Sequence, residues 1–272
     1  MRKKTKKRCY FFLTIAGLLI LLAIFAPYFC PNDPYKTNPA AMKVAPCLEY
    51  PFGTDKLGRC VFSRVLMGAR TSIFCSMILV AVDFLIGTIL GLLCGYYEGI
   101  FDTLIMRFAD ILLAFPQMVL AIAVAGILGG SMLNAMIAMG FAGWTLYARL
   151  ARSQVLAIKQ EEFVKAARMG GCSDARILVF HLLPNVLGTL IVNATNDIGS
   201  TMIGFAGLSF LGLGVQVPQA EWGSMINESR AYLQIAPWAA LFPGAAIVIT
   251  VMVFNYLGDA VRDLLDVEGQ HE

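Results

Sequence analysis

Charged residues are scarce in this 272-residue chain. They make up 14% of the sequence, whereas soluble globular domains carry about 25%. Hydrophobic residues make up 58%, and the mean hydropathy is +0.71. This composition lies far outside the range of soluble domains, so we expect a protein surrounded by membrane lipid, with no nucleic-acid partner.

Sequence patterns for nucleotide and metal chemistry are missing as well. No G-x-x-x-x-G-K-[ST] phosphate loop occurs, so this chain cannot bind ATP by that mechanism. The seven cysteines are odd in number and show no C-x-x-C spacing, which argues against a metal centre. We expect no catalytic residue, no metal and no cofactor held by this chain.

Long uncharged runs are the main feature that is present. A bilayer crossing needs about 20 apolar residues, and in lipid a helix satisfies its own backbone. The run from Ile111 to Ala148 is too long for one helix and is divided at Gly129-Gly130-Ser131. The sequence therefore predicts an all-α membrane protein with six transmembrane helices. The spans are Cys9 to Asn32, Thr71 to Tyr97, two within Ile111 to Ala148, Leu182 to Ala220, and Ala231 to Gly258.

Basic residues predict the orientation. They cluster before the first span and between spans four and five, at Arg2, Lys3, Lys4, Lys6, Lys7, Arg8 and at Arg149, Arg152, Lys159, Lys165, Arg168, Arg176. With six crossings both clusters lie on one side, which the positive-inside rule makes cytoplasmic. We therefore expect both termini in the cytoplasm. The predicted parts are a basic tail (1–9), a first transmembrane helix (10–30), an external segment (31–70), a permease-like core (71–262) with a cytoplasmic loop (149–185), and a second tail (263–272).

The cytoplasmic loop has the features of a docking element. From Glu161 it reads EEFVKAARMGGCSDARILVFHLLPN. Small residues at Ala166 and Ala167 let a partner approach the backbone, Gly171 suits the left-handed position that ends a helix, and Pro184 suits the start of the next one. With these residues the loop resembles the cytoplasmic coupling loop of membrane subunits of ATP-binding-cassette (ABC) importers, although Lys165 stands where that family has an acidic residue.

Further segments extend this resemblance from Pro51 to Asp266. The ordered set is similar to the dipeptide, oligopeptide and nickel permease family, and it comprises PFGTDKLGR, SRVLMGAR, GYYEGIFD, MRFADILLAFP, LSFLGLGV, EWG and FNYLGDAVRDLLD. Cys60 and Val267 depart from the family pattern. The resemblance implies one N-terminal helix followed by a five-helix type I ABC importer core.

The same resemblance implies how the chain works. It would be a transport subunit and no enzyme. Its partners would be a homologous permease, two cytoplasmic ATPase subunits that bind ATP and Mg²⁺, and an extracellular or periplasmic solute-binding protein. The predicted ATPase-coupling residues are Glu161, Glu162, Phe163, Val164, Lys165, Ala166, Ala167, Met169 and Gly171, with Phe163, Val164 and Met169 as apolar contacts. The alternative is a solvated loop with incidental alanines.

Two acidic residues, Asp83 and Asp197, lie near the middle of predicted spans. An unpaired charge there costs at least about 2.5 kcal/mol, so such residues are functional candidates. Asp197 belongs to a polar stripe at helical spacing, formed by Thr189, Asn193, Asn196, Asp197, Ser200 and Gly204. We expect Asp83, Asn193, Asn196, Asp197 and Ser200 to line a translocation path. The alternative is that Asp197 is neutral, or is hydrogen-bonded to a neighbouring helix.

The cargo is less constrained. NDIGSTMIGFAGLSFLGLGV and AEWGSMINESR look closer to nickel-type permeases, and two acids in the membrane suit a cation or metal chelate, so nickel or another chelate is the leading expectation. Di- or oligopeptides are the alternative. An ion-coupled secondary transporter, in which the acids relay protons, is a second alternative. All three place the protein in a bacterial inner or plasma membrane.

Overall fold

The apolar runs form long helices. The computed structural model describes residues 2–269, with the side chains of residues 5–265, and this part contains helices and a single β-bridge between Thr54 and Cys60. The helices are α1 (Arg2–Phe29), α2 (Val61–Tyr97), α3 (Gly99–Leu113), α4 (Gln117–Leu128), α5 (Met132–Ile158), α6 (Glu162–Met169), α7 (Asp174–Arg176), α8 (Leu183–Phe210), α9 (Trp222–Ser229) and α10 (Trp238–Gly269). Shorter turns are η1 (Pro39–Ala41), η2 (Ile177–Leu182) and η3 (Arg230–Tyr232).

Membrane-spanning segments can be assigned by length and hydropathy. Four described segments are long and apolar enough to cross a bilayer: Thr5–Phe29, Val61–Tyr97, Asp174–Phe210 and Trp238–Leu265. A fifth results if the bent pair α3 and α4 is one span. The described structure thus supports a multi-pass helical protein, while the count of six stays a prediction. The predicted tail at 263–272 and the departure at Val267 extend beyond the described side chains.

The third predicted span differs from a straight helix. α3 and α4 meet at a bend of 90°, and the break falls at Ala114, Phe115 and Pro116. Proline has no N–H to donate, and its ring moves the preceding residue out of helical conformation. The sequence contained this signal, but a run of apolar residues alone does not show where it bends.

The division at Gly129-Gly130-Ser131 is where the sequence predicts it. α4 ends with Gly129 at a φ of 87°, a left-handed conformation that favours glycine. Ser131 then caps α5, because its side-chain oxygen accepts a hydrogen bond from the Asn134 N–H at 3.1 Å. The chain can therefore reverse direction between α4 and α5.

α2 and α5 pack closely along their length. Gly87, Gly91 and Gly95 follow one another at intervals of four residues on α2. A Cβ on Gly91 would lie 2.6 Å from the Ala151 Cβ, and one on Gly95 would lie 2.8 Å from the Val155 Cβ. Glycine at this spacing lets two helix backbones approach in a membrane. The sequence reasoning missed this G-x-x-x-G-x-x-x-G pattern, although it is legible in the sequence.

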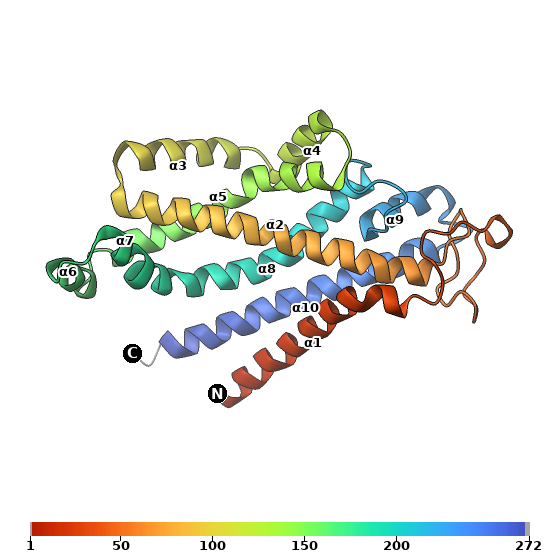
Figure 1. Ribbon diagram of the computed structural model, residues 1–272, viewed down its shortest axis with the longest axis horizontal. Helices are drawn as coiled ribbons and strands as arrows, with labels where there is room; N and C mark the ends of the chain where they lie inside the picture. The colour runs from red at the N-terminus through yellow and green to blue at the C-terminus, as the bar shows by residue number, and fades with distance from the viewer. Residues whose placement is uncertain (1, 270–272) are drawn as a thin grey trace.

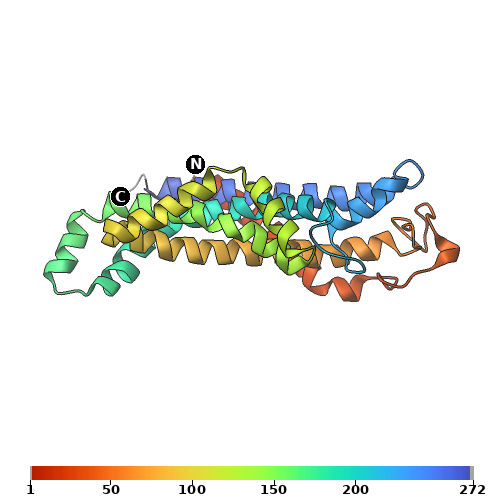
Figure 2. The same ribbon diagram turned by 90° about the horizontal axis from the view of Figure 1, so that it is seen from above.

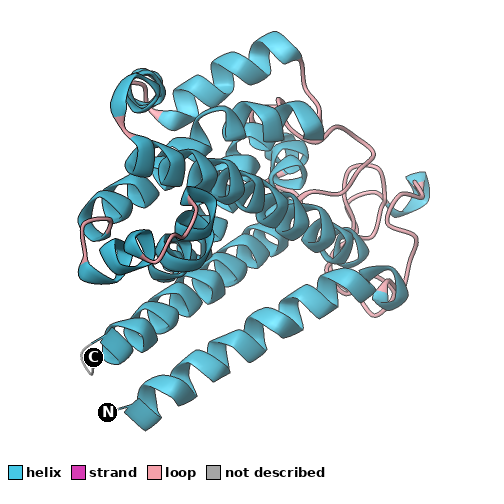
Figure 3. Cartoon of the chain, turned by 60° about the vertical axis from the view of Figure 1, so that its left-hand side comes forward, coloured by secondary structure: helices cyan, strands magenta, loops and turns pink. Residues whose placement is uncertain are grey.

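The helices form an elongated bundle whose two ends differ. Figure 1 shows both termini and α6 at one end, while α9 and the long segment between α1 and α2 lie at the other. Figure 2 gives the same separation from above, and Figure 3 shows α1 running beside α10. The two basic clusters of the sequence are therefore at the same end.

The α2–α5 contact leads to a prediction about stability. Replacing Gly91 with Ala should lower the free energy of unfolding by about 1–3 kcal/mol, because an extra methyl overpacks a close contact. The measurement is the thermal midpoint of the purified transporter in detergent. Gly126→Ala is the matched control, since a Cβ there meets no atom within 4 Å. Equal midpoints for the two variants would contradict the assignment.

Candidate functional site

The predicted docking element is a separate short helix. α6 has Glu162 in its first turn and Arg168 in its last, the order that the helix dipole favours. At its end the Gly171 N–H donates to the Arg168 carbonyl and the Cys172 N–H to the Ala167 carbonyl, both at 3.1 Å. Gly171 has a φ of 79°. This is a Schellman ending, as the glycine predicts.

The side chains of α6 divide into an inner and an outer set. Val164 is 1% exposed and packs in a cluster with Ile177, Leu182 and Val186. Phe163 and Met169 are 42% and 86% exposed. The prediction that Val164 contacts a partner is therefore corrected, because it faces the protein's own core. Ala167 is half-buried. The remaining predicted coupling residues are exposed: Glu161, Glu162, Lys165, Ala166 and Gly171.

The polar stripe of α8 borders several cavities, and two of them take most of its residues. One, of about 510 Å³, lies between α8 and α10 and is lined by Asn193 and Asn196. The other, of about 360 Å³, lies between α4, α5 and α8 and is lined by Asp197 and Ser200. All lining residues of α8 recur three or four positions apart and form what we call the α8 face: Asn185, Gly188, Thr189, Val192, Asn193, Asn196, Asp197, Ser200, Thr201, Ile203, Gly204 and Gly207.

The structure brings the two predicted intramembrane acids against α5. The Tyr147 hydroxyl of α5 donates to the Asp197 Oδ2 at 2.9 Å, as the packing alternative for Asp197 required. Asp83 of α2 is 4% exposed, and its carboxylate occupies the space that a Cβ on Gly143 would take. Asp197 nevertheless borders a cavity, so it is both hydrogen-bonded and accessible. Tyr147 was missed, because hydropathy gives no sign of which helix faces Asp197.

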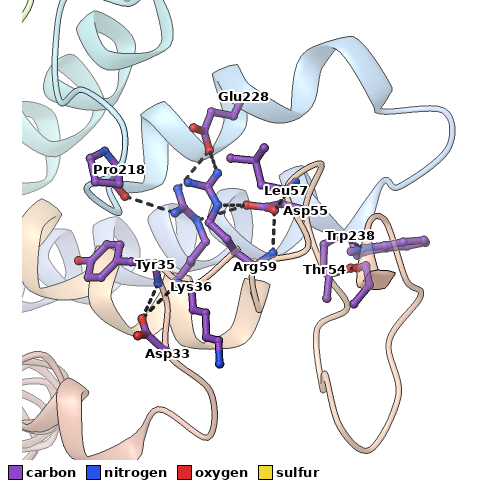
Figure 4. Close-up of polar contacts among 12 residues, drawn as sticks. Asp33, Tyr35, Lys36, Thr54, Asp55, Leu57, Arg59, Pro218, Glu228 and Trp238 are labelled. Atoms are coloured by element: carbon purple, nitrogen blue, oxygen red, sulfur yellow. Dashed lines mark hydrogen bonds and ion pairs between the residues drawn. The ribbon is translucent and has the colours of Figure 1, made fainter. Parts of the chain in front are cut away.

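At the opposite end, four charged side chains form what we call the α9 clasp: Asp55, Arg59, Arg64 and Glu228. Figure 4 labels Asp55, Arg59 and Glu228. The Arg59 Nε lies 2.6 Å from the Asp55 Oδ2, and its Nη2 lies 2.7 Å from the Glu228 Oε2. The Arg64 Nη2 lies 3.1 Å from the same Glu228 oxygen. Both arginine side chains are 1% exposed. The clasp therefore ties the segment before α2 to α9.

The residues of the EWG segment have structural roles beside the clasp. Glu221 accepts hydrogen bonds from the N–H groups of Gly223 at 2.8 Å and Ser224 at 2.7 Å, and so caps α9. The pKa of Glu221 is raised, because the effect of burial exceeds the opposite effect of these hydrogen bonds. The Trp222 Nε1 donates to the Val65 carbonyl at 2.9 Å. The segment thus holds α9 against α2.

Two of the basic residues from which the sequence predicts the orientation, Arg149 and Arg152, form ion pairs. Arg152 of α5 binds the Asp102 carboxylate of α3 through two hydrogen bonds, of 2.5 and 2.6 Å. Arg149 pairs with Asp110, also of α3. These pairs hold the amphipathic α3 against α5. Pairing partners from distant segments cannot be read from spacing along the chain.

Comparison with known families decides the identity. Residues 87–267 match the family described as "Binding-protein-dependent transport system inner membrane component". The chain belongs to this family. Residues 4–46 match the "N-terminal TM domain of oligopeptide transport permease C", which accounts for α1 as a separate first helix.

Three relatives align with nearly the whole chain. A dipeptide transport system permease protein of Alkalihalophilus pseudofirmus is 44% identical over 93% of this chain and 85% of its own length. A glutathione transport system permease protein of Escherichia coli is 47% identical over 92% and 82%. A probable D,D-dipeptide transport system permease protein of E. coli K12 is 43% identical over 93% and 85%.

A solved transporter shares the fold. A chain of the MetNI methionine ABC transporter, in inward-facing conformations, matches with a TM-score of 0.55 at 18% identity, over 71% of this chain and 94% of that chain. The protein is thus a multi-pass inner-membrane permease subunit of an ABC importer and not an enzyme. Such a permease works with ATPase subunits and a solute-binding protein. The secondary-transporter alternative is accordingly wrong.

The α9 clasp generates a prediction. Glu228→Gln removes one of two acids and leaves two buried arginines with Asp55 alone, which should cost about 3 kcal/mol. The measurement is the thermal midpoint of the purified transporter. Glu49→Gln, which changes an exposed acid in the segment between α1 and α2, is the control. A clasp variant as stable as the control would show that these pairs contribute nothing to the fold.

Proposed function

We propose that this permease transports di- or oligopeptides, together with a homologous permease, two cytoplasmic ATPase subunits and an external solute-binding protein. The observation that supports this cargo is that three relatives, 43–47% identical over more than nine tenths of the chain, are named for dipeptides, D,D-dipeptides or glutathione. The nickel expectation finds no support among these names, so the peptide alternative replaces it.

The proposed topology keeps six crossings: α1, α2, the bent pair α3–α4, α5, α8 and α10. α5 carries Arg149 and Arg152 toward its end, which lowers its hydropathy without shortening it. Both termini and α6 share one end of the bundle (Figure 1), and the positive-inside rule favours the cytoplasm for that end. Residues 31–70 then face outward, as in the predicted division of the chain.

The α8 face is the proposed wall of the translocation path. From Asn185 to Gly207 a helix rises about 33 Å at 1.5 Å per residue, close to the roughly 30 Å of a bilayer's hydrocarbon core. Two cavities border this length. Asn193, Asn196, Asp197 and Ser200 offer hydrogen bonds along it, whereas Asp83 is buried beside Gly143 of α5 and lines neither cavity. A homologous permease would supply the opposite wall.

α6 is the proposed ATPase-docking helix. Its outer side presents Phe163, Ala166 and Met169, while Val164 and Ala167 fix its inner side to the core. ATP and Mg²⁺ are held by the partner ATPases, whose closure would move α6 and the helices behind it as rigid bodies. Energy would thus enter through a surface that binds no nucleotide itself.

The cargo proposal predicts selective uptake. Vesicles containing the complete transporter, with its solute-binding protein outside and ATP inside, should accumulate a labelled dipeptide and not ⁶³Ni²⁺. Uptake should need ATP and continue in the presence of an uncoupler, because ATP and not a proton gradient supplies the energy. Scintillation counting of filtered vesicles gives both rates.

Two further results decide this proposal. Nickel accumulation without peptide accumulation would overturn the peptide assignment. Asp197→Ala should lower the peptide rate at least fivefold with unchanged cargo affinity of the solute-binding protein. An unchanged rate would remove Asp197 from the path.

The docking proposal predicts uncoupling by a bulky residue. Ala166→Trp should reduce cargo-stimulated ATP hydrolysis at least tenfold, since Ala166 is exposed on the outer side of α6 and leaves its core contacts intact. Ala167→Trp should do the same but also disturbs the core. Ala175→Trp, at an exposed alanine of α7, is the control. Normal stimulation in Ala166→Trp would count decisively against docking.

A further inference from the structure

One aromatic residue at the end of α2 holds the end of α6 and the start of α7. The Tyr96 hydroxyl donates to the Asp174 Oδ1 at 2.6 Å and accepts from the Arg168 Nη2 at 3.2 Å. The Arg168 guanidinium carbon also lies 5.8 Å from the centre of the Tyr96 ring, within the range of a cation–π contact. Tyr96 therefore binds the last turn of α6 and the first residue of α7 at the same time.

The other side of α6 is tied to the same turn of α2. Lys159, which follows α5, donates to the Gly95 carbonyl at 3.1 Å and pairs with Glu98. The segment from Lys159 to Asp174, which contains all of α6, is thus bound at both ends to residues 95–98. We call this set of contacts the α2 bracket, formed by Gly95, Tyr96, Glu98, Lys159, Arg168 and Asp174.

The bracket joins a rigid pair of helices. Leu92 of α2 and Val164 of α6 lie in one buried cluster, against which Tyr96 also packs. Behind it, Gly91 and Gly95 hold α2 close to Ala151 and Val155 of α5. α6 also packs against η2 and the start of α8, because Val164 shares its buried cluster with Ile177, Leu182 and Val186. The bracket adds hydrogen bonds and an ion pair that tie the α6 segment to α2 as well.

We propose that Tyr96 is a positioning residue that couples movement of α6 to α2 and α5, so that these two helices are an arm on which the ATPases act, beside η2 and α8. This inference rests on the docking role proposed for α6. It adds a connection to α2 that the docking role alone does not assign. The hydroxyl is the essential group, because it is the atom shared by Arg168 and Asp174.

The test separates hydrolysis from transport. In vesicles with the complete transporter, Tyr96→Phe keeps the ring and removes both hydroxyl contacts. Basal ATP hydrolysis should stay within twofold of wild type, while dipeptide transported per ATP hydrolysed should fall at least fivefold. Tyr97→Phe is the matched control, since Tyr97 is adjacent, 55% exposed and outside the bracket, and it should keep the wild-type ratio.

A pair of changes at Asp174 tests the same hydrogen bond from its other side. Asp174→Asn keeps an acceptor oxygen and should retain the wild-type ratio within twofold, whereas Asp174→Ala should reproduce the Tyr96→Phe loss. A normal transport-to-hydrolysis ratio in Tyr96→Phe overturns the inference. So does an equal fall in hydrolysis and transport with loss of the ATPase subunits on purification, because that result indicates a purely structural role.

The docking proposal and this inference can be disproved separately. If Ala166→Trp uncouples the transporter and Tyr96→Phe does not, α6 docks but α2 is not an arm, and only the inference falls. If Ala166→Trp leaves coupling intact, docking itself is wrong. The cargo assignment is independent of both, because absence of peptide uptake by the wild-type transporter would be seen before any variant is compared.

Discussion

The close contact between α2 and α5 is the constraint on which the other features depend. In lipid, apolar side chains gain little by leaving their surroundings for a helix interface, so packing and hydrogen bonds must hold helices together. Gly87, Gly91 and Gly95 provide the packing, because each lacks the Cβ that would strike α5. The same contact brings Lys159 to the end of α2, and α5 also carries Tyr147, which binds Asp197 of α8. Both candidate sites thus involve α5.

Charge is rare in the chain, and the described charges at the two ends of the bundle serve different purposes. The α9 clasp buries two arginines with two acids, which fixes α9 over the start of α2. At the other end Arg168 and Asp174 remain exposed and meet at a tyrosine hydroxyl. Exposed contacts of this kind are worth less than buried ones. One end is therefore held by buried ion pairs, and the other by exposed hydrogen bonds at Tyr96.

Most of the helical architecture was predictable from local signals. Hydropathy located the long helices, the glycine pair and Ser131 located the turn between α4 and α5, and Gly171 located the end of α6. These features depend on neighbouring residues, so sequence spacing reveals them. The bend at Pro116 was equally local, but it was overlooked because apolar composition was weighed before backbone chemistry. The site was only half predictable, since Val164 turned inward and Tyr147 and Tyr96 were not expected.

The sequence by itself determined that this chain enters a bilayer, where its helices break, and where the short exposed helix α6 ends, because these follow from hydropathy and backbone conformation within a few residues. The tertiary structure alone decided which helices touch, and hence that Arg59 finds Glu228, that Asp197 finds Tyr147, and that Arg168 finds Tyr96. The physical reason is that a hydrogen bond or an ion pair depends on distance in space. Partners separated by 50 to 169 positions along the chain leave no periodic trace in the sequence.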